Sequence, residues 1–191
     1  MDIYQERYLK HQHNKTTNMH KFIGEEKLHY THQEIDTLFK ILNNRRSQRN
    51  FTKQNIKLDV LKTIEQSIAL NPSSCNRKSI YGAWITPEGI DQYLVGAKVW
   101  APKANSILLL FAAKEAYKSP NEKAFMPYLD GGFVAQTLYL VCEVLGIGAC
   151  FINPNLVKEN AEEFTLMYGD DYFVGAFALG NYDYKAKNPN L

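Results

Sequence analysis

The amino-acid sequence predicts an α+β fold, in which helices come first and strands then alternate with helices. Two patterns lead to this prediction. Apolar residues recur at helical spacing within residues 32–70 and again within residues 131–145. Short apolar runs occur in the rest of the chain, and the run at 106–113 is typical of a strand that is buried on both faces.

The first helix is predicted over about 32–44. Thr31 and Glu34 have the spacing of a capping box, in which each side chain accepts the other residue's backbone N–H, and apolar residues then follow at helical spacing. Residues 1–30 are polar and lack clear periodicity. We therefore expect an N-terminal arm over residues 1–30 and one domain over residues 31–191.

The remaining elements follow in chain order. Helices are predicted near 57–70, 90–97, 131–145 and 155–166, and strands near 81–86, 106–113, 149–152 and 172–179. Asp130 and Asn155 are predicted to cap the last two helices, and Gly146 is predicted to end the first of these two. Residues 114–127 are polar and contain two prolines, so a surface loop is expected there.

Composition restricts the class of function. The net charge of the 191 residues is only +2, so composition gives no reason to expect nucleic-acid binding. The three cysteines form no Cys-x-x-Cys pair, which favours a reducing compartment over a disulfide framework. The N-terminal residues 1–21 lack the apolar core of a signal peptide, and no apolar run approaches the length of a membrane helix, so we expect a cytoplasmic protein without a membrane partner. All five histidines fall within the first 32 residues without matched cysteine or acidic partners, so no metal site is expected.

Three segments carry residue types that suit ligand binding. Residues 44–51 contain three arginines and a serine, whose donors suit phosphate oxygens, although a basic helix end has the same composition. Residues 72–76 form a small polar turn, which either lines a ligand or only connects a helix to a strand. Residues 126–138 and 146–153 predict an apolar helix, a tight turn and a buried strand, and by themselves they indicate only a core.

Together these segments resemble the nitroreductase family. The motifs are Arg-Arg-Ser-x-Arg-x-Phe at 45–51, Pro-Ser-x-x-Asn at 72–76, Tyr-x-Asp-x-Gly-x-x-x-Gln-x-Leu at 128–138 and Leu-Gly-x-Gly at 145–148. The resemblance covers roughly residues 38–187. It implies a mixed, mostly antiparallel sheet flanked by helices, and an intertwined homodimer that binds FMN where the two subunits meet.

The resemblance also implies roles for individual residues. Arg45 and Ser47 would hold the FMN phosphate and ribityl chain, and Arg46 would contribute at the same turn. Arg49 would reach the N1–C2 carbonyl edge of the ring, where a cation stabilises the negative charge of the reduced flavin. The other implied contacts are a loop given to the partner subunit's site (Pro72, Ser73, Ser74 and Asn76), a strand end beside the ring (Phe151, Ile152 and Asn153) and a basic pair returning to the phosphate (Lys185 and Lys187).

By this resemblance the chain is expected to be an FMN-dependent oxidoreductase. It would pass electrons from NADH or NADPH, through the flavin, to a nitro compound, a quinone or another conjugated acceptor, with no protein nucleophile. Two alternatives remain open: a flavin-binding or regulatory module with little turnover, and a chain that has lost flavin altogether. Cys75 is expected to fill a tight turn, and Cys142 and Cys150 are expected in the core.

Overall fold

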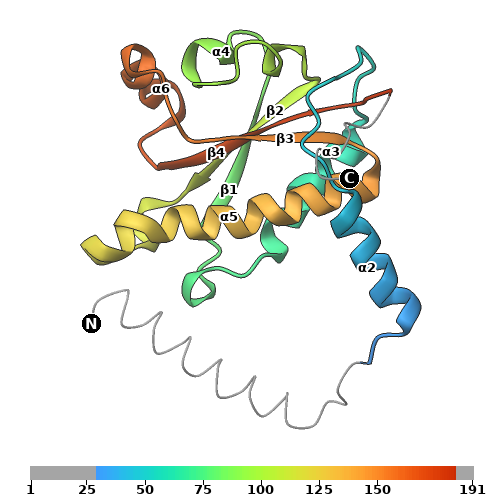
Figure 1. The fold of residues 1–191 in the computed structure, drawn as a ribbon. Coiled ribbons are helices and arrows are strands. Elements are labelled where there is room, and N and C mark those ends of the chain that lie inside the picture. Colours follow the sequence, from blue (N-terminus) through green and yellow to red (C-terminus); the bar gives the residue numbers. More distant parts are fainter. Residues whose placement is uncertain (1–28, 184–191) are drawn as a thin grey trace. The chain divides into compact units, whose positions relative to one another are not determined.

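The protein folds as a four-stranded antiparallel sheet between two layers of helices, as the computed structural model of residues 29–183 shows (Figure 1). The strands lie in the order β1-β2-β4-β3. Their bounds are β1 (Ile80–Ile85), β2 (Ser106–Ala112), β3 (Gly148–Ile152) and β4 (Tyr172–Gly180). The predicted α+β class and all four predicted strands are confirmed.

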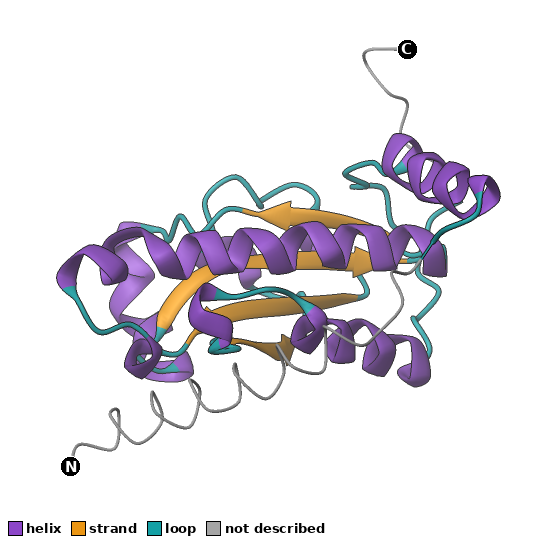
Figure 2. Cartoon of the chain, turned by 90° about the horizontal axis from the view of Figure 1, so that it is seen from below, coloured by secondary structure: helices purple, strands orange, loops and turns teal. Residues whose placement is uncertain are grey.

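Helices cover both faces of this sheet. The α-helices are α2 (His32–Asn44), α3 (Leu58–Ser67), α4 (Ile90–Tyr93), α5 (Pro120–Leu145) and α6 (Ala161–Tyr168). The long helix α5 and the shorter α3 pack on one face, and α4 and α6 lie over the other (Figures 1 and 2). Within the described residues, no helix is long and apolar enough to cross a membrane.

Strand β2 explains why two helical layers are needed. Leu108 and Leu110 point into the core beneath α3 and α5, whereas Ile107, Leu109 and Phe111 point into the core beneath α4 and α6. Each of the five side chains is at most 1% exposed. An apolar run without alternation is therefore required here, because a central strand covered on both faces must bury every side chain.

The chain divides into two compact units at the bond between Leu38 and Phe39, and α2 crosses this division. The capping box at the start of α2 is confirmed: the Glu34 N–H donates to Thr31 Oγ1 at 3.3 Å, and the Thr31 N–H donates to Glu34 Oε2 at 2.7 Å. Most of the expected arm, residues 1–28, lies outside the described residues. The boundary between residues 30 and 31 therefore stays a prediction.

Helix α5 starts earlier than the sequence patterns predict. The expected loop at 114–127 is wrong from residue 120 onward, because Ser119 and Glu122 form a capping box and the helix begins directly at Pro120. A proline in the first turn costs no hydrogen bond, since its missing N–H would have no partner in the helix. Asp130 consequently lies inside α5 rather than at its start, so the predicted cap at Asp130 is also wrong.

The segment before α6 corrects the predicted cap at Asn155. Here the backbone is extended and pairs with the end of α4: the Val95 N–H donates to the Asn155 carbonyl at 2.9 Å, and the Val157 N–H donates to the Tyr93 carbonyl at 2.8 Å. This pairing also ends α4 at Tyr93, four residues before the predicted end. Helix α6 begins only at Ala161, because the preceding backbone is already engaged in the pairing.

Gly175 shapes the part of β4 that faces β3. Its φ of +135° accompanies a β-bulge in the pairing of β2 with β4. A Cβ atom built at this position would lie 2.3 Å from Cζ of Phe151. Glycine is therefore required both by the backbone conformation and by the close approach of the Phe151 ring.

Candidate functional site

Residues 45–49 lie along the outer edge of β3. Ser47 forms a parallel bridge with Ala149, and the Gln48 N–H donates to the Ala149 carbonyl at 2.9 Å. Gln48 is almost fully buried, whereas its neighbours Ser47 and Arg49 are half-buried and exposed. The sheet edge thus fixes the backbone between the arginines and leaves their side chains outside the core.

Arg46 differs from the other two arginines of this segment. Its Nη1 donates to the carbonyls of Asn43 and Arg45, both at 2.6 Å. These carbonyls lie at the C-terminal end of α2, where helical backbone acceptors lack partners and a cation is favourable. The helix-end interpretation of the basic cluster is therefore correct for the Arg46 side chain.

Arg45 and Ser47 converge on Tyr139 of α5. The Arg45 guanidinium carbon lies 4.7 Å from the centre of the Tyr139 ring, a cation–π contact. Ser47 Oγ lies 3.0 Å from the Tyr139 hydroxyl, which also accepts the Phe151 N–H at 2.8 Å. One tyrosine therefore joins the arginine segment to the edge of β3.

Arg49 lies further along the same edge. Its guanidinium carbon is 5.4 Å from the centre of the Trp100 ring. Burial raises the pKa of the Cys150 thiol, and the nearby Arg49 partly offsets this increase. Within residues 29–183, neither Arg45 nor Arg49 forms an ion pair with a carboxylate.

The loop at 72–76 is held by Asp130. The Ser74 N–H and Oγ both donate to Asp130 Oδ1 at 2.8 Å, and Ser79 and Tyr117 donate to Asp130 Oδ2 at 3.2 and 3.0 Å. The Asp130 side chain is completely buried and accepts four hydrogen bonds. A buried carboxylate needs such partners. Ser74 is thus partly committed to holding the loop.

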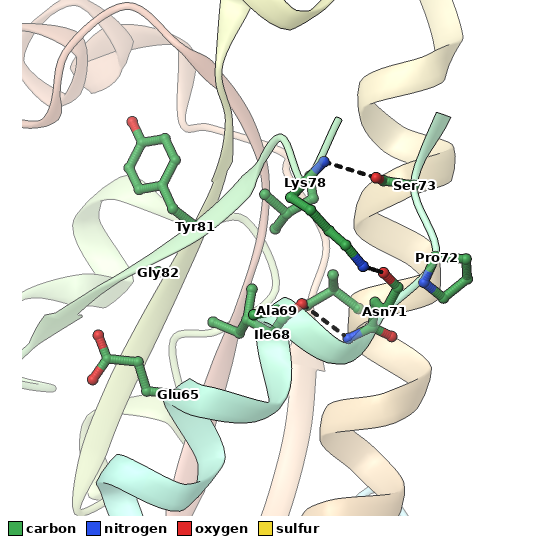
Figure 3. A pocket seen from close by; sticks show the side chains of 11 residues that line it. Glu65, Ile68, Ala69, Asn71, Pro72, Ser73, Lys78, Tyr81 and Gly82 are labelled. Carbon is green, nitrogen blue, oxygen red and sulfur yellow. Dashed lines mark hydrogen bonds between the residues drawn. The ribbon is translucent and has the colours of Figure 1, made fainter. Parts of the chain in front are cut away.

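This loop lies beside the outer edge of β1 and borders a pocket of about 250 Å³ (Figure 3). Pro72 and Ser73 line the pocket. Lys78 donates from its N–H to Ser73 Oγ at 2.8 Å and from Nζ to the Asn71 carbonyl at 2.5 Å (Figure 3). Cys75, Asn76 and Lys78 have φ values between 52° and 55°, a costly conformation for residues other than glycine. The loop is therefore a tightly specified structure, and Asn76 and Cys75 are exposed on it.

The strand end at 151–153 presents three different environments. Phe151 is half-buried, with its ring 5.3 Å from that of Phe177. The Ile152 side chain is 3% exposed and packs in the core beneath α4 and α6, so Ile152 can offer only its backbone to a ligand. Asn153 is exposed. Lys185 and Lys187 lie outside the described residues.

The predicted site residues thus form two groups at opposite edges of the sheet. Arg45, Ser47, Arg49 and Phe151 gather at β3, and the loop at 72–76 lies beside β1. Among the described residues no group of three or more side chains is placed to hold a metal ion. The cysteines are free, and Cys142 and Cys150 are buried as predicted.

The structure adds Tyr139, Trp100 and Asp130 to the residues that shape the site. Tyr139 lies 92 residues from Ser47 along the chain, and Asp130 lies 56 residues from Ser74. No local pattern connects residues so far apart. Asp130 carried one usable signal, because a carboxylate within an apolar helix must find donors when it is buried.

Comparison with known proteins identifies a protein family with a similar sequence. Residues 91–181 match the model of the nitroreductase family. No curated protein sequence matches the chain.

Solved structures match over most of the chain. A nitroreductase family protein from Streptococcus pneumoniae is 16% identical, with a TM-score of 0.67 over 79% of this chain and 93% of its own. An FMN-dependent nitroreductase from Clostridium difficile is 18% identical, with a TM-score of 0.65 over 80% and 92%. A Desulfovibrio desulfuricans protein solved in complex with FMN is also 18% identical, with a TM-score of 0.65 over 80% and 91%.

Proposed function

The chain has the nitroreductase fold and matches the nitroreductase family over residues 91–181, and we propose that it is an FMN-dependent oxidoreductase. It takes electrons from NADH or NADPH and passes them to a nitro compound, a quinone or another conjugated acceptor. Support comes from the fold, from the FMN-dependent and FMN-bound proteins that share it, and from the donors along β3. A cytoplasmic location belongs to the same proposal.

The observation that carries this proposal is the arrangement of Arg45, Ser47 and Arg49 along one sheet edge. Arg45 and Ser47 meet at Tyr139 and offer a guanidinium and a hydroxyl, a donor set suited to a phosphate monoester. Arg49 is exposed beside Trp100, without a carboxylate partner in the described part of the chain. The donor set therefore fits a ligand with a phosphate at one end and a ring with a carbonyl edge at the other.

FMN, when bound, would supply the redox chemistry, since its ring can take up a hydride and give up electrons. The chain's own residues position it and set its charge environment. Arg45 and Ser47 would bind the phosphate, and the Arg46 side chain stabilises the end of α2 from which they extend. Arg49 would place a fixed positive charge at the ring edge, where it would stabilise the negative charge that develops on reduction.

A homodimer completes the proposed site. The loop at 72–76 is anchored on α5 at Asp130 and the arginine segment at Tyr139, about 13 Å apart at the helical rise of ~1.5 Å per residue. One chain therefore holds the two groups at separate places, whereas a second copy can bring its loop to the first copy's arginines. Four large side chains of α5 are exposed at helical spacing and suit such an interface: Phe125, Tyr128, Leu129 and Phe133.

The test is the visible absorption spectrum of the purified protein before and after FMN addition, followed by NADH and NADPH oxidation with a quinone and a nitroaromatic acceptor. A bound-flavin spectrum together with acceptor-dependent oxidation is expected. If the protein binds FMN but shows no turnover with any acceptor, the enzyme hypothesis is rejected and the protein is a flavin-binding or regulatory module. A colourless protein that does not take up FMN would exclude both.

A further inference from the structure

Tyr139 connects three groups of the proposed anion site without belonging to the segment that forms it. Its hydroxyl accepts the Phe151 N–H at 2.8 Å and lies 3.0 Å from Ser47 Oγ. Its ring lies beneath the Arg45 guanidinium and packs edge-on against Phe177, with the ring centres 5.0 Å apart. The ring is therefore fixed by the core on one side and holds a cation on the other.

The proton count fixes the direction of one hydrogen bond at Tyr139 and leaves two directions for the bond with Ser47. A tyrosine hydroxyl has one proton to donate, and the Phe151 N–H can only donate, so Tyr139 accepts from Phe151. The tyrosine proton is then available to Ser47 Oγ. Burial raises the pKa of Tyr139, so the hydroxyl keeps this proton at neutral pH.

The proton of Ser47 decides what this serine can do for an anion. If Ser47 donated to Tyr139, its only proton would be used inside the protein and Ser47 could not donate to a phosphate. If Tyr139 donates to Ser47, the serine proton stays available for a bond to an anion, and Arg45, which lies over the same tyrosine ring, can add its guanidinium donors. An anion selects the second arrangement, and a chain of hydrogen bonds of this kind strengthens each donor along it.

Resting on the proposed function, we propose that Tyr139 is a positioning residue for the phosphate end of the flavin. The Phe151 N–H orients the Tyr139 hydroxyl, Tyr139 donates to Ser47, and Ser47 donates to the phosphate. The ring at the same time holds Arg45 beside this donor. Tyr139 does not touch the ligand and acts through Ser47 and Arg45.

The experiment is a double-mutant cycle of Tyr139→Phe and Ser47→Ala, with dissociation constants measured for FMN and for riboflavin, which lacks the phosphate. Tyr139→Phe keeps the ring under Arg45 and removes only the hydroxyl. It should weaken FMN binding about fivefold, as expected for one neutral hydrogen bond, and leave riboflavin binding unchanged. In the Ser47→Ala background the same change should cost less than about twofold, because the residue through which Tyr139 acts is gone.

Tyr93→Phe is the matched control, because the Tyr93 hydroxyl donates to Glu163 of α6 at 3.0 Å and takes no part in the hydrogen bonds that join Ser47, Tyr139 and Phe151. It should leave the FMN dissociation constant unchanged. The assignment would be overturned if Tyr139→Phe lost the same affinity for riboflavin as for FMN, or if the losses of affinity were additive in the double variant. Tyr139 would then be a packing residue. A wild-type protein that binds riboflavin and FMN equally would overturn it too. If the wild-type protein bound neither FMN nor riboflavin, that result would instead reject the proposed function itself.

Discussion

Arg45, Arg46 and Arg49 lie within five residues, yet their guanidinium groups have three different surroundings. Arg46 bonds backbone carbonyls at the end of α2, Arg45 lies over Tyr139, and Arg49 lies over Trp100. The chemistry of arginine is the same at each position. What differs is the neighbour that the fold supplies, and this neighbour separates a helix-end cation from two cations that lie over aromatic rings.

Replacement of these arginines one at a time should separate their roles. Arg45→Ala is expected to weaken FMN binding about 10- to 100-fold, the loss of one or two hydrogen bonds to a charged group. Arg49→Ala should change FMN affinity less and should mainly slow flavin reduction by NAD(P)H, since its charge is placed at the ring. Fluorescence titration with FMN and stopped-flow reduction measure the two effects.

Arg46→Ala and the exposed Lys53→Ala serve as controls for the removal of a positive charge. Both should keep FMN affinity within about twofold, and Arg46→Ala should lower the stability of the protein because the end of α2 loses its hydrogen bonds. If Arg45→Ala and Arg49→Ala both retained FMN binding and normal reduction, the whole cluster would be a basic helix end.

At the scale of elements, α5 organises the molecule. It packs under the sheet, anchors the loop at 72–76 through Asp130 and anchors the arginine segment through Tyr139 (Figure 2). Its N-terminal turn is itself stabilised by the capping box and by the ion pair of Arg77 with Glu122 at 2.9 Å. The positions of both site segments therefore depend on this one helix.

The Glu122 carboxylate should make stability depend on pH in the acidic range. The hydrogen bond from Arg77 is the main reason why its pKa falls from 4.5 to about 2 in the folded protein. A depressed pKa in the folded state contributes stability above the unfolded pKa, and this contribution disappears as the pH falls from about 4.5 to about 2. Urea unfolding of wild type and Glu122→Gln should differ at pH 7 and converge towards pH 2. A difference that stays constant across this window would contradict the assignment.

Asp130 should determine the stability of the loop at 72–76. Asp130→Asn replaces an acceptor-only carboxylate by an amide that cannot accept from all four donors, and it is expected to lower the free energy of unfolding by about 2–3 kcal/mol. Ser74→Ala removes one of the four bonds and should cost about 1 kcal/mol. Chemical denaturation measures both, and an Asp130→Asn protein as stable as wild type would disprove this role.

At the scale of the whole molecule, the proposed site needs two chains. Phe133→Asp places a charge within the exposed apolar face of α5, where a partner surface would have to desolvate it. We expect a monomer by light scattering after size exclusion, together with a large loss of FMN affinity.

Leu166→Asp is the matched control, because Leu166 is 81% exposed on α6, which packs on the opposite face of the sheet from α5. It should leave both the dimer and FMN binding intact. A wild-type protein that is monomeric and still binds FMN would contradict the two-chain site.

The sequence by itself determined the elements whose signals are local. The capping box at Thr31, the glycine that ends α5 and the apolar run of β2 each depend on residues a few positions apart, and the structure has all three. The start of α5 also has a local signal, the capping box of Ser119 and Glu122, but the two prolines nearby favoured the prediction of a loop. The motif order also predicted the nitroreductase fold, because four spaced motifs together are far more specific than one.

Only the tertiary structure decided how the arginine cluster divides and what supports it. Tyr139, Trp100 and Asp130 reach their partners across 92, 51 and 56 residues of chain, since a sheet and a long helix bring distant segments together. Periodicity and capping report on the neighbours along the chain. Whether an arginine faces a carbonyl, an aromatic ring or an open surface depends on neighbours in space, and these exist only once the core has packed.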